Sequence, residues 1–160
     1  MTDLVGVEKL EKIVNFIASF VDEEYTAFLG ADSMADVEKL SIYFSIVVIE
    51  REDKLFMEDI YSREGNLPIL SNLLWSILHE IGHLETRDEM EDDTTERQAI
   101  SDLSYISPDE ASHKYHQLYN EVIATDWAVM FALENATRCR LWDKLLLSEL
   151  QNFLEVNGVE

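Results

Sequence analysis

Apolar residues in the first part of the chain follow two different periods. Residues 7–29 carry them at the spacing of an amphipathic helix, which Gly30 would end. Residues 40–49 are instead rich in β-branched and aromatic residues, and alternate side chains there would line one face of a strand. Residues 54–61 resume an extended pattern after a charged interruption. A β-hairpin over residues 40–61 is therefore expected.

Helical patterns dominate the rest of the chain. The predicted helices cover residues 68–85, 96–103, 108–134 and 141–154. The first of these is apolar around most of its circumference, so we expect it to be central and buried, with Pro68 in its first turn. Ser107-Pro108-Asp109-Glu110 is typical of a capping box and predicts the start of the long third helix. Asn157-Gly158 would end the last one.

These elements predict an α+β fold. A small antiparallel sheet, the hairpin, would pack with the buried helix, a second long helix and flanking N- and C-terminal helices. The length of 160 residues fits a single domain over residues 1–160, and there is no internal repeat or linker-like stretch. With 47% hydrophobic residues the chain has ample surface to bury, which excludes disorder for most of it.

The charge balance limits the partners and the location that we expect. There are 33 acidic and 12 basic residues, and the net charge of −21 repels nucleic acid phosphates and anionic membranes. No apolar run approaches the ~18 residues that span a bilayer, and Met1-Thr2-Asp3 does not begin a signal peptide. Cys139 is the one cysteine, which excludes a disulfide framework and fits a reducing compartment. We therefore expect a cytoplasmic protein without direct nucleic acid or membrane binding.

The buried helix contains His79-Glu80-Ile81-Gly82-His83, an HExxH motif. Residues four apart on a helix project side by side, so two imidazoles can bind one zinc ion while the adjacent Glu80 reaches a water molecule on the metal. Zinc lowers the pKa of that water toward ~7, and Glu80 would take its proton as general base while the water attacks a polarised carbonyl.

A structural role for these residues is the main alternative, because a lone histidine in an apolar helix is more often a hydrogen-bonded core residue. Here two of the four histidines and a glutamate interrupt the most apolar helix together. A metal ion would satisfy all three polar groups at once, whereas burying them unsatisfied costs several kcal/mol. The motif arises by chance in a chain of this composition with a probability of about 1%.

A catalytic zinc usually has three protein ligands, and the third must lie outside the motif helix. No Gly or His follows at the places that HExxHxxGxxH requires. The predicted helix 108–134 offers Glu121 at the edge of an apolar segment. It shares a face with small side chains that would let this helix approach the motif helix closely. The residues of this face are Glu121, Ala124, Thr125, Ala128 and Ala132.

The motif helix followed by an E-x-x-A-x-x-x-A helix resembles the ImmA/IrrE family of gluzincin-type metallopeptidases, often encoded by phages and mobile elements. The matching residues are His79, Glu80, His83, Glu121, Ala124 and Ala128. The resemblance covers about residues 1–135 and implies three zinc ligands, His79, His83 and Glu121, with Glu80 as general base. Where the family usually has Asp or Asn, this chain has Thr125, and the carboxylate of Asp126 comes one position later.

Further polar residues are candidates for contacts around the site. Asp126 would either orient a ligand histidine through its second ring nitrogen or pair with Arg138 or Arg140. Residues just before Glu121 would bind substrate or stabilise an oxyanion, or else serve as packing and surface residues. They are His113, Tyr115, His116 and Tyr119. The acidic run 88–93 would form a mobile lid, a docking surface for a basic partner or a solvated loop.

The sequence thus predicts a zinc metallopeptidase that hydrolyses a peptide bond in a protein or peptide substrate. A regulatory protein such as a basic, DNA-binding repressor is the expected partner, because the segment 85–96 carries seven acidic residues against Arg87 alone. This segment lies between the HExxH motif and Glu121, the two parts of the predicted zinc site. The alternative function is a catalytically inactive regulatory protein that keeps the fold and binds a partner through its acidic surface. A metal-free helical protein with a coincidental motif is the third hypothesis.

Overall fold

A computed structural model describes residues 5–158 of the chain. In that range it contains α-helices, one 3₁₀-helix and three short strands. The elements are α1 (Val7–Val21), β1 (Thr26–Leu29), β2 (Met34–Asp36), β3 (Ser41–Phe44), α2 (Glu50–Arg63), α3 (Asn72–Glu85), η1 (Arg87–Glu89), α4 (Thr94–Ser104), α5 (Pro108–His116), α6 (Tyr119–Glu134) and α7 (Ala136–Val156).

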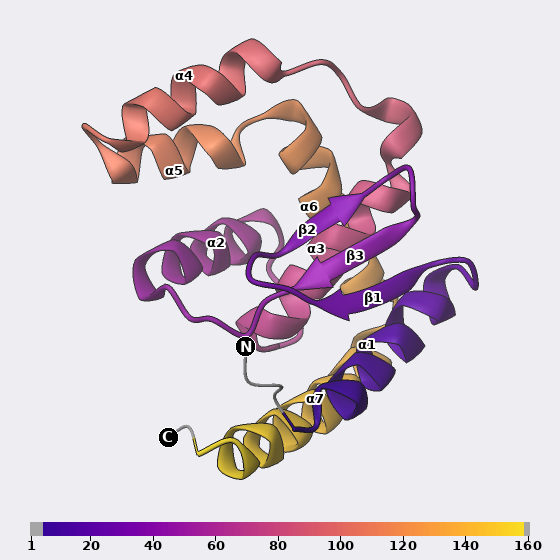
Figure 1. Cartoon of the computed structure of the whole chain (residues 1–160). Helices are drawn as coiled ribbons and strands as arrows, with labels where there is room; N and C mark the ends of the chain where they lie inside the picture. Colours follow the sequence, from indigo (N-terminus) through magenta and orange to yellow (C-terminus); the bar gives the residue numbers. More distant parts are fainter. Residues whose placement is uncertain (1–4, 159–160) are drawn as a thin grey trace.

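The predicted α+β class is confirmed, with a small sheet packed against helices. The strand order is β1-β3-β2, with β1 parallel and β2 antiparallel to the central β3, so the sheet is mixed. The side chains of Ile42 and Phe44 on β3 are fully buried. They join the apolar core that α3 contributes to most strongly. The sheet therefore covers one side of the helix that carries the HExxH motif (Figure 1).

The position of the hairpin was predicted wrongly. Residues 54–61 lie in α2, and the antiparallel partner of β3 is β2, which precedes it. Phe56 and Ile60 are four residues apart and so share one face of the helix, which packs against the core. Acidic residues at 50, 52 and 53 also favour a helix N-terminus here, because they complement its dipole.

The first helix is shorter than predicted. It ends at Val21, and residues 26–29 of its predicted range form β1. Side chains of α1 hold this strand, since the Asn15 amide donates to the Ala27 carbonyl and accepts from the Ala27 amide, both at 2.8 Å. The Glu11 carboxylate accepts from the Leu29 amide at 2.8 Å. Polar groups of the helix thus stabilise the outer edge of the sheet.

Helix boundaries also differ elsewhere, and α7 begins at Ala136 rather than at residue 141. The motif helix α3 begins after Ser71, whose hydroxyl accepts a hydrogen bond from the Leu74 amide at 3.2 Å, rather than at Pro68. The predicted helix 108–134 is divided into α5 and α6 at residues 117–118, and Ser107 makes no side-chain capping bond. The short predicted helix 96–103 is confirmed within α4.

The helices form two groups on either side of the sheet and α3 (Figure 1). Helices α1 and α7 run side by side, and α6 packs extensively against α3. Helices α4 and α5 stack on each other as a hairpin beside α2. The region between this hairpin, the sheet and α3 holds the polar residues of the motif.

Candidate metal centre

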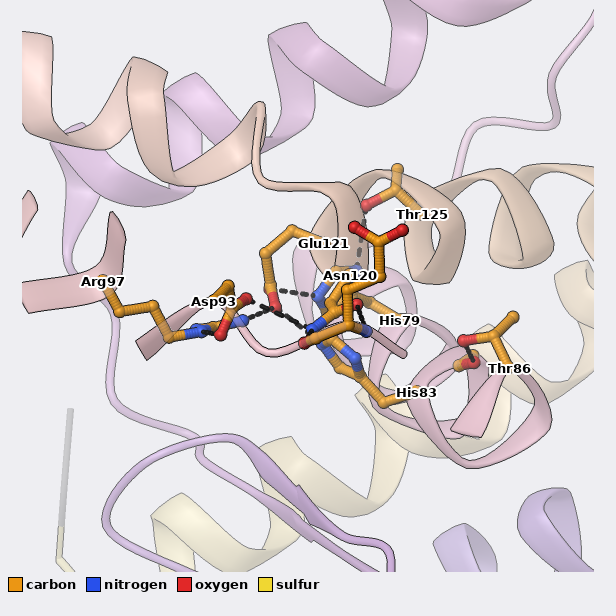
Figure 2. A network of polar contacts seen from close by, with 10 residues as sticks. His79, His83, Thr86, Asp93, Arg97, Asn120, Glu121 and Thr125 are labelled. Carbon is orange, nitrogen blue, oxygen red and sulfur yellow. Dashed lines mark hydrogen bonds and ion pairs between the residues drawn. The ribbon is translucent and has the colours of Figure 1, made fainter. Parts of the chain in front are cut away.

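Helices α3 and α6 bring His79, His83 and Glu121 together in the interior. The potential ligand atoms of the three side chains all lie within 4.8 Å of one another. The residues are 7%, 8% and 1% exposed, so the group is nearly closed to solvent. Figure 2 shows both rings turned toward the Glu121 carboxylate. The structure thus contains a buried His-His-Glu group that could bind a metal ion.

Each histidine contacts a different oxygen of Glu121. His79 Nε2 lies 3.0 Å from Oε1, and His83 Nε2 lies 3.1 Å from Oε2. The close approach of the helices uses the predicted small face, because Ala124, Ala128 and Ala132 are all buried. The carboxylate of α6 can therefore reach both rings of α3.

The second ring nitrogen of His79 has a defined partner. Its Nδ1 lies 2.9 Å from the Thr125 hydroxyl, which is itself buried (Figure 2). A partner at Nδ1 fixes the orientation of the ring and leaves Nε2 for the ligand position. Thr125 thus provides the contact that holds the second ring nitrogen of His79.

Asp126 fulfils neither expectation for it. Its carboxylate pairs with Arg63 of α2, and not with a histidine, Arg138 or Arg140. The Asp126 side chain is 58% exposed, on a different face of α6 from Thr125. One step along a helix turns the side chain by about 100°, so Asp126 points away from the side on which Thr125 meets His79. The structure therefore does not bring Asp126 into contact with the ligand histidines.

The electrostatics of the buried His-His-Glu group favour a positive charge between the two rings and the carboxylate. Burial alone would raise the pKa of Glu121, but the hydrogen bonds from His79 and His83 outweigh it and hold that pKa far below its usual range. Burial opposes protonation of His79, yet the hydrogen bond to Glu121 and the charge of Glu80 raise the pKa of His79 overall. A proton or a metal cation between the rings and the carboxylate satisfies this demand.

Three polar residues around Glu121 were not predicted from the sequence. Arg97 of α4 donates from Nη2 to Glu121 Oε2 at 2.8 Å and from Nε to Asp93 at 2.8 Å. Asn120 donates to Asp93 at 3.2 Å (Figure 2). The signal available in the sequence was an arginine four residues after an aspartate, within a stretch that is otherwise acidic.

Glu80 faces an open cleft rather than the ligand network. It is 7% exposed and lines both a cavity of about 460 Å³ and a neighbouring cavity of about 440 Å³. Within residues 5–158 no group donates a hydrogen bond to its carboxylate. Burial raises its pKa, partly offset by the two histidines. A carboxylate in this position is available to exchange a proton with a molecule in the cleft.

The other candidate residues divide into two groups. Tyr115 lines both cavities, and burial and the Glu121 carboxylate raise its pKa strongly. His116 lines the larger cavity, stacks on Phe56 at 5.9 Å between ring centroids and has its pKa lowered by burial. His113 and Tyr119 are exposed and line neither cavity, so the structure does not bring them to the centre.

Comparisons with protein-family models, with curated proteins and with solved structures find no match for this chain. What the molecule itself defines is an α+β protein with a buried His-His-Glu group at a cleft, beside a glutamate that accepts no hydrogen bond from residues 5–158. Among the helices described, none has the length and apolar character needed to cross a membrane.

Proposed function

We propose that this protein is a zinc-dependent metallopeptidase that hydrolyses a peptide bond in a protein substrate. The observation that carries the proposal is the position of Glu80. Its carboxylate is buried, has no hydrogen-bond donor within residues 5–158, and opens into the cleft directly beside the His-His-Glu group. We also propose, from the resemblance of the motifs, that the protein is related to the ImmA/IrrE family.

The donor set suits zinc. Two imidazole nitrogens and a carboxylate oxygen are typical zinc ligands, and three protein ligands leave a coordination position open for chemistry. His79, His83 and Glu121 would hold the ion between the two ring nitrogens and the carboxylate oxygens that now contact one another. When bound there, zinc supplies a Lewis acid that polarises a carbonyl group and lowers the pKa of water to about 7.

Glu80 and Thr125 would carry out the remaining steps. Glu80 removes a proton from water as the water oxygen forms a bond to the carbonyl carbon, and it delivers that proton to the amine nitrogen as the carbon–nitrogen bond breaks. Its raised pKa favours this exchange, because it brings the acid and base forms closer in energy. Thr125 keeps the His79 ring in position through Nδ1. The products are one new carboxyl group and one new amine.

The expected substrate is a protein segment that can enter the cleft, such as a segment of a basic DNA-binding regulator. This preference is supported by the acidic residues 88–93, which lead from α3 to the helix that carries Arg97. A cytoplasmic location is part of the same proposal, in agreement with the free, buried Cys139.

Two measurements test the proposal. Purified protein should contain about one zinc ion per chain, and His83→Ala should lose it. Glu80→Gln should retain the zinc but abolish cleavage. In a pull-down this variant should capture intact substrate, whereas wild-type protein should cleave the substrate and release the fragments. Cleavage by the Glu80→Gln variant at the wild-type rate would refute the assignment of Glu80.

One observation favours the alternative of a catalytically inactive binding protein. Glu121 is already satisfied by His79, His83 and Arg97, so the network is complete within the chain itself. Such a protein would bind its partner through the acidic surface, with or without metal. In that case wild-type and Glu80→Gln protein would capture the same intact partner with equal yield.

A further inference from the structure

The two cavities beside Glu80 form one cleft with two chemically different parts. They share Ser33, Glu80 and Tyr115, so they meet at the proposed general base. A segment bound across the cleft would place one residue in each cavity, with the peptide bond between them close to Glu80. The side chains that line each cavity therefore bear on the kind of substrate that fits.

Apolar side chains from two loops and from α2, α4 and α5 line the larger cavity. They are Ala31, Val47, Ile49, Phe56, Ile100, Pro108 and Ala111. Val47 and Ile49 are 64% and 51% exposed, although large aliphatic side chains gain free energy when they are covered. The volume of about 460 Å³ has room for a bulky side chain and its adjoining backbone. Acidic side chains of Asp32, Glu52 and Asp53 also border this cavity.

The smaller cavity is acidic on one side, and Met34, Ala35, Val37 and Met90 also line it. Its lining includes the carboxylates of Glu80, Glu91, Asp92, Asp93 and Glu121 against the guanidinium of Arg97. Arg97 is engaged by Asp93 and Glu121 and does not offset the other charges. Asp92 accepts from Thr94, whereas no side chain within residues 5–158 pairs with the Glu91 carboxylate. A positive side chain would find a free acceptor here, close to Glu80.

We propose that the cleft recognises an extended peptide segment in which a bulky apolar residue adjoins a lysine or arginine. The apolar side chain occupies the larger cavity, the basic one occupies the smaller cavity beside Glu91, and the bond between them lies at Glu80. This inference rests on the proposed peptidase function for its account of cleavage, but the binding preference follows from the cavity linings alone.

The test uses fluorescein-labelled octapeptides of Gly, Ser and Asn that carry a central Leu-Lys or Lys-Leu pair. Their binding to zinc-treated Glu80→Gln protein is measured by fluorescence anisotropy. We expect the better of the two orders to bind at least about tenfold more tightly than peptides with Ser in place of Leu. The same factor is expected over peptides with Glu in place of Lys. Equal binding of all peptides would overturn the proposal.

Matched protein variants assign the two cavities. Ser112→Phe places a ring in the larger cavity and should weaken the leucine peptide about fivefold or more, whereas Ser148→Phe on the exposed side of α7 should not. Glu91→Lys should weaken the lysine peptide about tenfold, whereas Glu96→Lys, outside the cavity, should change it little. Equal effects of a variant and its control would overturn the assignment of that cavity.

Incubation of wild-type protein with the same peptides separates this inference from the proposed function. Selective binding without cleavage would support the cleft preference and refute the peptidase. Cleavage of every peptide at one rate would support the peptidase and refute the preference. Mass spectrometry of the products identifies the bond, which we expect between the apolar and the basic residue. Cleavage elsewhere in the peptide would contradict the assigned position of the bond.

Discussion

The α-carbon of Gly82 packs directly against the backbone of Ala124. A methyl group at position 82 would lie 2.4 Å from the Ala124 carbonyl oxygen, a separation that two non-bonded heavy atoms do not adopt. Gly82 precedes His83 on α3, and Ala124 is one turn after Glu121 on α6. The missing side chain at residue 82 therefore sets the distance across which His83 reaches Glu121.

Gly82→Ala should separate the two helices and weaken the His-His-Glu group. Overpacking of this kind costs about 1–3 kcal/mol, and the better helix propensity of alanine returns at most about 1 kcal/mol. We expect a lower melting temperature and weaker zinc binding in a chelator competition. Gly65→Ala is the control, because a methyl group there would meet nothing within 4 Å. Unchanged zinc affinity in Gly82→Ala would contradict the idea that this contact sets the ligand spacing.

Thr125→Val should lower metal affinity without unfolding the protein. Valine keeps the shape of threonine but removes the hydroxyl that contacts His79 Nδ1 at 2.9 Å. Loss of such an outer contact typically costs about 10–100-fold in metal affinity. Thr125→Ser should restore most of it, and Thr137→Val at an exposed position of α7 should have no effect. The measurement is again chelator competition, and equal zinc affinity in wild type and Thr125→Val would count against this role.

The site was predictable where its geometry is local. The spacing of four residues on a helix places His79 and His83 side by side whatever the rest of the fold does. Glu121 followed from the small residues that share its face. The contact of Arg97 with Glu121 spans 24 residues and depends on how the α4–α5 hairpin docks, which no periodicity encodes.

The fold was predictable where the pattern is long. The buried helix α3 and the class of the fold follow from strong apolar periodicity. β1 and β2 have four and three residues, too few for alternation to be distinguished from chance. The short stretch 54–61 mixes apolar and charged residues in a pattern that suits a strand or a helix. It forms a helix, in which Phe56 and Ile60 pack against the core.

Asp143→Asn should destabilise the start of the motif helix. The Asp143 carboxylate of α7 accepts hydrogen bonds from the Ser71 amide at 2.9 Å and from the Ser71 hydroxyl at 2.5 Å. An amide side chain can keep one of these bonds but loses the charge, so we expect a loss of about 1–2 kcal/mol in the free energy of unfolding. Urea denaturation measures it, with Asp88→Asn on exposed η1 as the control. Equal losses in both variants would show that the Ser71 contact has no special weight.

The stability of the metal-free protein should depend on pH through His79 and Glu121. The lowered pKa of Glu121 contributes stability that is present above its unfolded value of 4.5 and is lost as the pH falls. The raised pKa of His79 contributes stability that is present below its unfolded value of 6.5 and is lost as the pH rises through the folded value. The pair therefore stabilises the metal-free fold most between these two values.

Bound zinc should reverse the alkaline part of this profile. Zinc binds the neutral imidazole, so the stabilisation of the fold by zinc grows as the pH rises past 6.5. Over the same range the stabilisation by the metal-free pair of His79 and Glu121 is lost. We expect urea denaturation with a chelator to give a difference between wild type and His79→Gln that shrinks from pH 6 to pH 9, and denaturation with excess zinc to give one that grows. If the difference follows the same course with and without zinc, the ion does not bind at His79.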